Sequence, residues 1–435
     1  MNQQLQDIAK RYEEGAIKTQ HLEATIFEEI YGSDREKLAA ACADAARIRC
    51  EQIEKKTGVE FTIAKNVPCN NCTLTKDGTV LSGIENKVGG AVIPLGIAGP
   101  VRINGQYAKG DFYLPLATNE AALLAGVQRG IKAINLAGGV NTMVTFDGMM
   151  RASLVEAPNL QRARQLIDDL KDPAYIAELG TYVKDPFVQL YDIQCYQMGN
   201  KVFMRMFCHT GDAMGMNGVT KATADVTKAI LARYTDFQLI TISSNFCCDK
   251  KSNHVNILSG RGKAVQANVF LPEEVLKKVF KKGITSRKVE RVVFNKCYLG
   301  SALAGTLGGF NVNAANPIAA FYAATGQDLA HVVSSSSCFV QAESFDDGLL
   351  FQATFPNLEV AAMGGGTMFG TARECLKLIG CDRVGTSLED NVSVKKVAEI
   401  AAVCAISLDL NTACAQASGY EMAEGHVRLA RGEKD

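Results

Sequence analysis

The stretch that most constrains the fold runs from residue 300 to residue 328 and reads GSALAGTLGGFNVNAANPIAAFYAATGQD. Small apolar residues fill it, which favours burial because small side chains let other backbones approach closely. Its glycines predict a turn with an accessible backbone, followed by an Ala-rich run. One carboxylate, Asp328, ends the run, and an unpaired buried carboxylate costs free energy. Asp328 is therefore either solvated at a helix end or used by the protein.

The composition is that of an ordinary globular protein. Of the 435 residues, 47% are hydrophobic and 21% are charged, which indicates two or three domains. Lys and Arg (46) balance Asp and Glu (46), so a nucleic acid is not an expected partner. The N-terminus, MNQQLQDIAKRYEEG, lacks the apolar core of a signal peptide, and no uninterrupted apolar stretch has membrane-spanning length. We therefore expect a soluble, cytoplasmic protein without a membrane partner.

The 14 cysteines are spread along the chain among mostly apolar neighbours, which favours buried, reduced thiols over a disulfide framework. Cys69 and Cys72 have the spacing of half a zinc site. The other half would need Cys247 and Cys248, which are adjacent and lack that spacing. We expect no metal.

The amino-acid composition and its periodicity change several times along the chain. Residues 2–56 have the apolar spacing of helices, whereas from Val80 short strands are expected in a Gly-, Val- and Ile-rich segment. Residues 155–240 alternate helices and strands and predict a small α+β domain inserted into a larger one. The Ala- and Gly-rich texture returns from about residue 250. The pattern predicts a multidomain protein of α+β or α/β class.

Residues 118–136, TNEAALLAGVQRGIKAINL, predict a helix that Thr118 or Asn119 caps. Glu120 would lie in its first turn, where the helix dipole stabilises a carboxylate. The functional alternative is a carboxyl group whose pKa is raised by burial, so that it can donate a proton.

Four other segments have a structural and a functional interpretation. Residues 211–217, GDAMGMN, form either a plain capped turn or a helix start that binds a phosphate group. Lys250 and its neighbour in DKK (249–251) are either solvated or held in a cleft to polarise a carbonyl oxygen. The GGGT segment (364–367) is a turn by default and also allows a ligand against bare backbone. His426, one of five histidines, is either merely exposed or a mobile acid near neutrality.

Taken in order, seven motifs are specific: ENKVGGAVIPLGIAGP (85–100), TNEAALLAG (118–126), GDAMGMN (211–217), DKK (249–251), GSALAGTLGGFN (300–311), GQD (326–328) and GGGT (364–367). Together they resemble 3-hydroxy-3-methylglutaryl-CoA (HMG-CoA) reductase, from about residue 10 to the end. The chain resembles class I, the class of eukaryotes and archaea, more closely than the other class. It is similar to a stand-alone, archaeal-type catalytic chain.

The resemblance implies a fold in three parts. The helical N-terminal domain would span 1–78, and a small inserted ferredoxin-like domain, 153–240, would bind the nicotinamide cofactor. The large domain, 79–152 and 241–435, would form around a long central helix, bind substrate and dimerise. The resemblance also implies a homodimer, or a tetramer, with the active site across the subunit interface.

The implied reaction reduces HMG-CoA to mevalonate and CoA with two hydrides, in isoprenoid synthesis. By motif, the catalytic residues are Glu120, Lys250, Asp328 and His426. Lys250 would stabilise the charge on the carbonyl oxygen, His426 would protonate the leaving thiolate, and Glu120 would protonate the aldehyde oxygen. Asp328 would keep Lys250 charged and raise the pKa of Glu120 by like-charge coupling.

The binding residues follow in the same way. The cofactor site comprises Lys184, Asp185, Asp212, Met214, Gly215, Met216 and Asn217. The substrate site comprises Glu85, Asn86, Arg151, Ser243, Lys251, Lys296, Asn316, Gly365 and Thr367. Glu85 and Asn86 belong to a motif at the dimer interface.

Three positions depart from the family pattern. Asp185-Pro186 stands before Phe187, where the family often has a basic residue that contacts the 2′-phosphate of NADPH. Lys184 or His209 could substitute, whereas an acid near the ribose favours NADH, so both cofactors stay open.

The other two departures concern the substrate region and the tail. Asn313 replaces a common histidine, and no serine follows His426, so we expect no control by phosphorylation there. The alternative functions are an NADH-dependent oxidoreductase of another CoA thioester and a non-enzymatic oligomeric binding protein.

Overall fold

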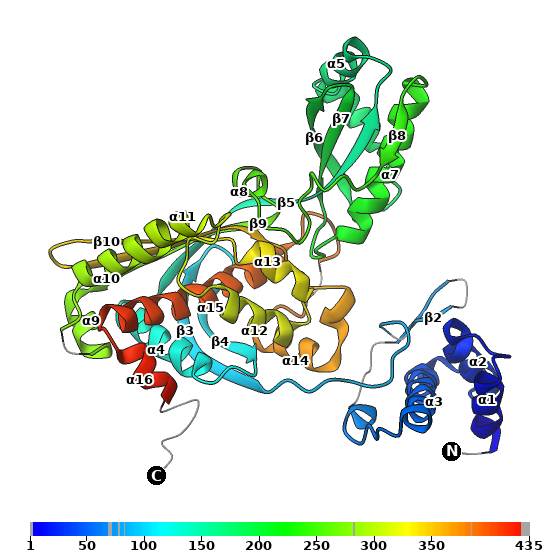
Figure 1. The fold of residues 1–435 in the computed structure, drawn as a ribbon, viewed down its shortest axis with the longest axis horizontal. Coiled ribbons are helices and arrows are strands. Elements are labelled where there is room, and N and C mark those ends of the chain that lie inside the picture. The colour runs from blue at the N-terminus through cyan, green and yellow to red at the C-terminus, as the bar shows by residue number, and fades with distance from the viewer. Residues whose placement is uncertain are drawn as a thin grey trace. The chain divides into compact units, whose positions relative to one another are not determined.

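The computed structural model describes residues 3–67, 72–76, 79–81, 83–281, 283–383 and 385–427. The chain divides into two compact units (Figure 1). The first comprises Met1–Pro94 with Gly365–Glu374, and the second comprises Leu95–Gly364 with Cys375–Asp435. The first unit therefore extends beyond residue 78, the end predicted for the N-terminal domain.

The first unit is built on three helices, as its apolar spacing predicts: α1 (Gln3–Glu13), α2 (Leu22–Glu29) and α3 (Leu38–Thr57). Their apolar faces form a core of their own around Ile8, Ile26 and Cys42. The buried Arg49 donates two hydrogen bonds to the carboxylate of Glu23, at 2.8 and 2.6 Å, which compensates both charges. A small antiparallel hairpin that the sequence did not indicate, β1 (Thr73–Leu74) with β2 (Val80–Leu81), also belongs to this unit.

The second unit contains one long, mostly antiparallel sheet with the strand order β10-β11-β9-β5-β3-β4. Its strands are β3 (Leu95–Gly105), β4 (Lys109–Ala117), β5 (Val140–Glu156), β9 (Gly262–Pro272), β10 (Phe339–Ser344) and β11 (Gly348–Leu358). Only the β3–β5 pairing is parallel among these neighbours. The expected short strands after Val80 are wrong in one respect, because Gly96, Gly99 and Pro100 lie inside the long strand β3. A register shift between Ala98 and Val101 accommodates them.

A long buried helix, α15 (Val392–Ala417), crosses the core of the second unit and packs against α4 (Leu123–Leu136) and α12 (Ala315–Thr325) (Figure 1). It is long and apolar enough to cross a membrane, but 89% of its most apolar window is buried inside the protein. That burial is typical of the core helix of a soluble protein. Close packing depends on a small residue, because a Cβ at Gly130 would lie 1.9 Å from the Ser407 carbonyl oxygen.

The remaining helical segments after the inserted region are short: α8 (His254–Ser259), α9 (Glu273–Val279), α10 (Ser286–Val293), the π-helix η4 (Phe294–Gly300), α11 (Ser301–Ala304), η5 (Leu329–His331), α13 (Val332–Ser335), η6 (Gly365–Met368), α14 (Gly370–Leu378) and α16 (Glu421–His426).

Residues 157–241 form a separate α+β arrangement whose sheet shares β5 with the larger one. It contains α5 (Leu160–Asp169), α6 (Pro173–Gly180), β6 (Gln189–Met198), β7 (Lys201–His209), α7 (Met216–Arg233) and β8 (Gln238–Thr241). Both β7 and β8 pair with the C-terminal half of β5, and a second apolar core fills this region. The expected α5, β7, α7 and β8 are present, whereas α6 and β6 were not predicted.

The stretch that opened the sequence analysis divides into two parts. Residues 301–307 are mostly exposed in this chain, and Leu303 retains 92% of its accessible surface. Helix α12 is largely buried and ends at Gly326, which has the left-handed φ of 67° that favours glycine. The expectation of burial throughout is therefore wrong for the first part, because the described residues of this chain leave the side chains of α11 largely exposed.

Candidate active site

The acid at the end of the small-residue run has a partner. The Nζ atom of Lys250 lies 2.8 Å from Oδ2 of Asp328, and both side chains are partly exposed. The other oxygen of Asp328 accepts a hydrogen bond from the Ala330 amide at 3.1 Å and caps η5. Burial raises the pKa of Asp328, but the hydrogen bonds from Lys250 and Ala330 outweigh it and lower the pKa below its ordinary value. Asp328 is therefore ionised near neutral pH.

The loop that presents Lys250 has a strained backbone. Lys250, Asn245 and Cys248 adopt left-handed φ angles of 57°, 63° and 49°. Such angles are uncommon for residues other than glycine, and they cluster at functional sites, where the surrounding structure holds them. The local geometry favours the functional interpretation of this lysine over a freely solvated one.

Three polar residues converge beside this loop. Arg151, on β5, donates from Nη1 to Ser243 Oγ at 3.0 Å, and the same nitrogen lies 3.7 Å from a carboxylate oxygen of Asp249. Its Nε donates to Thr220 on α7 at 3.1 Å. Lys251 donates to the Asp249 carbonyl at 3.2 Å. The structure thus brings Arg151, Ser243 and Lys251 together around Asp249, and that acid was not among the predicted site residues.

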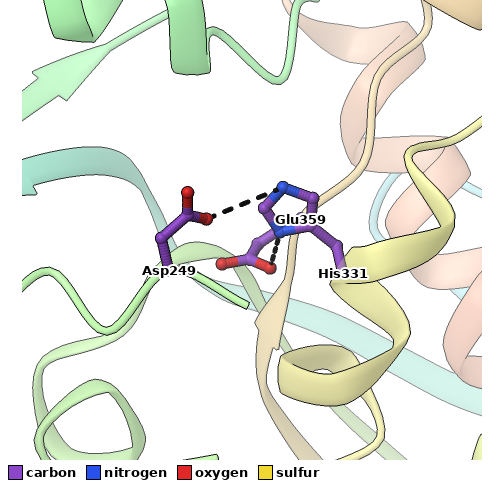
Figure 2. A group of neighbouring side chains, drawn as sticks. All are labelled: Asp249, His331 and Glu359. Carbon is purple, nitrogen blue, oxygen red and sulfur yellow. Dashed lines mark hydrogen bonds and ion pairs between the residues drawn. The ribbon is translucent and has the colours of Figure 1, made fainter. Parts of the chain in front are cut away.

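A buried charged group lies behind the Lys250–Asp328 pair. Arg261, Glu359 and His331 are completely buried, and Figure 2 shows the imidazole of His331 between the carboxylates of Asp249 and Glu359. Arg261 forms ion pairs with Glu359 and, at 2.9 Å, with Asp249. Burial, followed by the charge of Arg261, lowers the pKa of His331 to about 4, so the imidazole is neutral at pH 7.

Asp249, His331 and Glu359 also have the geometry of a metal site, since one ligand atom from each lies within 4.8 Å of the others. The sequence analysis found no such group because the three residues are far apart in the chain. Arg261 already supplies a cation to both carboxylates, which is the charge that a metal would otherwise provide. The donor set is therefore satisfied as a salt-bridge network.

Glu120 lies elsewhere, and its local prediction is wrong. Helix α4 begins at Leu123, after Ala122 with a φ of 71°, so Glu120 precedes the helix in a turn in which its amide donates to Thr118 Oγ1. The left-handed φ of Ala122 interrupts a helix, so the residues before it are not part of α4. Glu120 is exposed, so this single chain does not supply the burial that was expected for it. No hydrogen bond or ion pair joins it to Asp328 among the described residues.

Glu120 does share a cavity with the C-terminal helix. A cavity of about 540 Å³ is lined by Glu120, Asn313, residues of α4 and α15, and part of α16. Arg129 holds α16 in place by donating to Glu421 at 2.5 Å. His426 is the last residue of α16, and its side chain is outside the described part of the structure. Glu120 and the helix that carries His426 therefore border the same cavity.

The GDAMGMN segment opens α7 as predicted. Gly215, with a φ of 85°, immediately precedes the helix, and a Cβ there would lie 2.2 Å from the Thr210 side chain. Asp212 has a different role from the one expected, because its carboxylate is buried and accepts the amides of Gly385 and Val394 at 2.7 and 2.9 Å. Asp212 therefore anchors the GDAMGMN loop to the backbone at Gly385 and Val394, and its carboxylate does not face solvent.

The other predicted cofactor residues lie at or near the start of α7. Met216 is buried, Met214 is partly buried and Asn217 is exposed. The carboxylate of Asp185 lies against Gly218 in the first turn, 3.2 Å from the position of a Cβ there, whereas Lys184 is exposed. An acid at this place disfavours a phosphate group beside Gly218.

The remaining predicted substrate residues are divided between the two units. Glu85, Asn86, Gly365 and Thr367 belong to the first unit; Glu85 and Asn86 are exposed and Thr367 is buried. In the second unit, Lys296 is exposed on η4 and Asn316 is partly buried in the first turn of α12.

Sequence reasoning missed Asp249, Arg261, His331 and Glu359. One signal was available for Glu359, because a carboxylate inside the apolar run FPNLEVAAM must find a buried partner. His331 follows Asp328 by three residues, which places both on one helical face. Nothing in the sequence pairs either residue with Arg261.

Comparison with known proteins agrees with the motifs. Residues 45–431 match the family model of hydroxymethylglutaryl-coenzyme A reductase. The 3-hydroxy-3-methylglutaryl-coenzyme A reductase of Pyrococcus abyssi is 36% identical over 98% of this chain and 100% of its own length, and that of Aeropyrum pernix is 40% identical over 91% and 92%.

Solved structures extend the comparison to the fold. The class II 3-hydroxy-3-methylglutaryl-CoA reductase of Streptococcus pneumoniae, solved bound to NADPH in open conformations, matches 89% of this chain and 99% of its own with a TM-score of 0.60 at 17% identity. The mixed α+β fold is therefore shared with that enzyme, and the predicted resemblance is confirmed. The chain belongs to the hydroxymethylglutaryl-coenzyme A reductase family.

Proposed function

We propose that this chain reduces HMG-CoA to mevalonate and coenzyme A in the mevalonate pathway, with the Lys250–Asp328 pair at the centre of the reaction. Family membership supports the reaction. The observation that supports the residues is the ion pair of 2.8 Å on a loop whose backbone is strained at Lys250 itself.

Lys250 acts where charge develops. When a hydride reaches the thioester carbonyl carbon, the electron pair of the C=O bond moves to the oxygen, and the Lys250 ammonium stabilises that oxyanion. Asp328 keeps the lysine protonated and fixes its position. Arg151, Ser243 and Lys251 border the same loop, and a cationic and hydroxyl surface of this kind binds the carboxylate of the substrate.

Two further groups supply protons. His426 protonates the departing thiolate of coenzyme A, and Glu120 protonates the oxygen of the aldehyde. Glu120 and the helix that carries His426 border one cavity, and no hydrogen bond or ion pair among the described residues joins Glu120 to Lys250. This arrangement supports an active site completed by a second subunit. Burial of Glu120 at that interface would keep it neutral.

The start of α7 fits a nicotinamide dinucleotide. Its first amides, at Met216 and Asn217, are available for a phosphate group, and Gly215 provides the close approach of backbone that a diphosphate needs. Each bound nicotinamide cofactor, NADPH or NADH, would supply one hydride, so the oxidised cofactor is exchanged for a reduced one before the second reduction. Asp212 positions this loop, Met214 borders it, and Asp185 and Lys184 are placed to influence which cofactor binds.

The assembly we propose is a homodimer, or a tetramer, in the cytoplasm. Its interface includes a row of exposed apolar residues on η4, α11 and the following turn, namely Phe294, Leu299, Leu303 and Leu307. Glu85, Asn86, Lys296, Asn316, Gly365 and Thr367 complete the substrate site in this assembly. A division into three domains is supported by three separate apolar cores.

The test is coenzyme A release from HMG-CoA, followed with a thiol reagent, with NADPH and NADH compared. Lys250→Ala is the matched inactive variant, since the lysine is partly exposed and its loss leaves no buried charge unpaired. Thiol release by the wild type that Lys250→Ala abolishes would support the proposal. An absence of thiol release with both cofactors would contradict it and favour another CoA-thioester oxidoreductase.

A further inference from the structure

One buried imidazole has no role in the proposed reaction. His331 is completely buried; its Nδ1 is hydrogen-bonded to Glu359 Oε2, and its Nε2 lies 3.4 Å from Asp328 Oδ2 and 3.8 Å from Asp249 Oδ1. Within the described part of the chain Nε2 has no hydrogen-bond partner. An unpartnered ring nitrogen that faces the central carboxylate needs an explanation.

The contacts of Glu359 decide which ring nitrogen carries the proton. Ser334 donates its hydroxyl to Glu359 Oε2, and Arg261 pairs with Oε1, so Glu359 is held as a carboxylate. A carboxylate can only accept, so Nδ1 of His331 donates to it. In the neutral imidazole Nε2 is then a bare acceptor, 3.4 Å from Asp328 Oδ2. Figure 2 shows the same nitrogen facing Asp249, and Nδ1 facing Glu359.

The charges around His331 balance when the imidazole is neutral. Asp249 and Lys250 from the loop, Arg261 before β9, Glu359 after β11 and Asp328 before η5 all face it. With Arg151 beside Asp249, three cations oppose three anions. A bound divalent ion would add two positive charges to this balanced group, which disfavours a metal here.

We propose that His331 is a positioning residue for Asp328: Nε2 accepts a proton shared with the Asp328 carboxyl, so that Asp328 can change its charge without leaving Lys250. The inference rests on the proposed function. Each reduction consumes one proton, which ends on the coenzyme A sulfur in the first and on the aldehyde oxygen in the second. Negative charge develops on the substrate oxygen in both, so the charge around Lys250 and Asp328 changes within every cycle. In the resting protein Nε2 is unprotonated; during turnover a proton from solvent is held between Asp328 Oδ2 and His331 Nε2, and no electrons are transferred.

Two substitutions test the two ring nitrogens of His331 separately. His331→Gln places an amide N–H toward Asp328 but cannot accept a proton there, and His331→Asn keeps a donor toward Glu359 and leaves nothing at Nε2. We expect both variants to lose roughly tenfold or more in kcat with little change in KM. We also expect His331→Gln to move the acidic limb of the pH–kcat profile to lower pH, since a permanent donor favours ionised Asp328. His254→Gln, an exposed histidine near the same loop, is the control and should behave as the wild type.

A packing role makes a different prediction. Activity that falls only in proportion to the folded fraction, with an unchanged pH profile, would overturn the inference, as would unchanged kcat in both variants.

A second measurement does not depend on turnover. With ¹⁵N-labelled histidine, the His331 signals, assigned by their loss in His331→Gln, should show a neutral ring with unprotonated Nε2 at pH 7 and should shift in Asp328→Asn. A charged ring at pH 7, signals insensitive to Asp328→Asn, or a stoichiometric bound metal would refute the inference. If the wild type releases no coenzyme A, the proposed function fails, while the NMR result still decides the Asp328–His331 coupling.

Discussion

Asp328→Asn separates a catalytic role of the ion pair from a structural one. Asparagine retains an oxygen that can cap η5 through the Ala330 amide, so the local fold keeps its hydrogen bond. The substitution removes only the negative charge 2.8 Å from Lys250 Nζ.

The structure sets the size of the two effects. Two charges at 2.8 Å attract by about 6 kcal/mol at an effective dielectric constant of about 20. The two side chains are 41% and 37% exposed, however, so solvent screening reduces the net contribution to folding to about 0–1 kcal/mol. The loss of a charge that positions the oxyanion-stabilising group is expected to lower kcat by about 10²–10³-fold, equivalent to roughly 3–4 kcal/mol.

The assay is thiol release at saturating substrate together with the free energy of unfolding in urea. Asp111→Asn is the matched control, because Asp111 forms an exposed ion pair with Arg102 at 2.5 Å and lies outside the proposed site. We expect the control to keep full activity. A loss in Asp328→Asn of less than about fivefold, or a loss of stability of several kcal/mol, would refute the assigned role.

Four other outcomes follow from the structure. His426→Gln should lose thioester reduction and still reduce free mevaldehyde, and equal losses on both substrates would contradict its role. Leu303→Asp should weaken the oligomer in sedimentation, because it places a charge in an apolar row; an unchanged mass would exclude that interface. Gly215→Ala should weaken cofactor binding, measured by the KM for the dinucleotide, since its Cβ would meet Thr210. Burial raises the pKa of Asp409 to about 7, above its unfolded value. The free energy of unfolding of the wild type should therefore decrease as the pH rises from about 4 to about 7. Asp409→Asn should reduce this pH dependence in urea unfolding.

The sequence by itself determined the ordered set of motifs, and through them the family and the residues Lys250, Asp328 and the GDAMGMN helix start. These depend on local chemistry: a glycine that permits a left-handed turn, a cap, and an acid at a helix end. The alternation of helices and strands likewise indicated the inserted region before any contact was known.

Only the tertiary structure determined which distant side chains pair with one another. Arg261, His331 and Glu359 are separated by 70 and 28 positions in the chain and meet because β9, η5 and β11 converge, and no sequence period records such a meeting. The structure also decided the place of Glu120, because α4 begins at Leu123 and not at residue 118, after Ala122 with its left-handed φ. Propensity and spacing specify local elements, whereas the compensation of a buried charge depends on which distant elements pack against it.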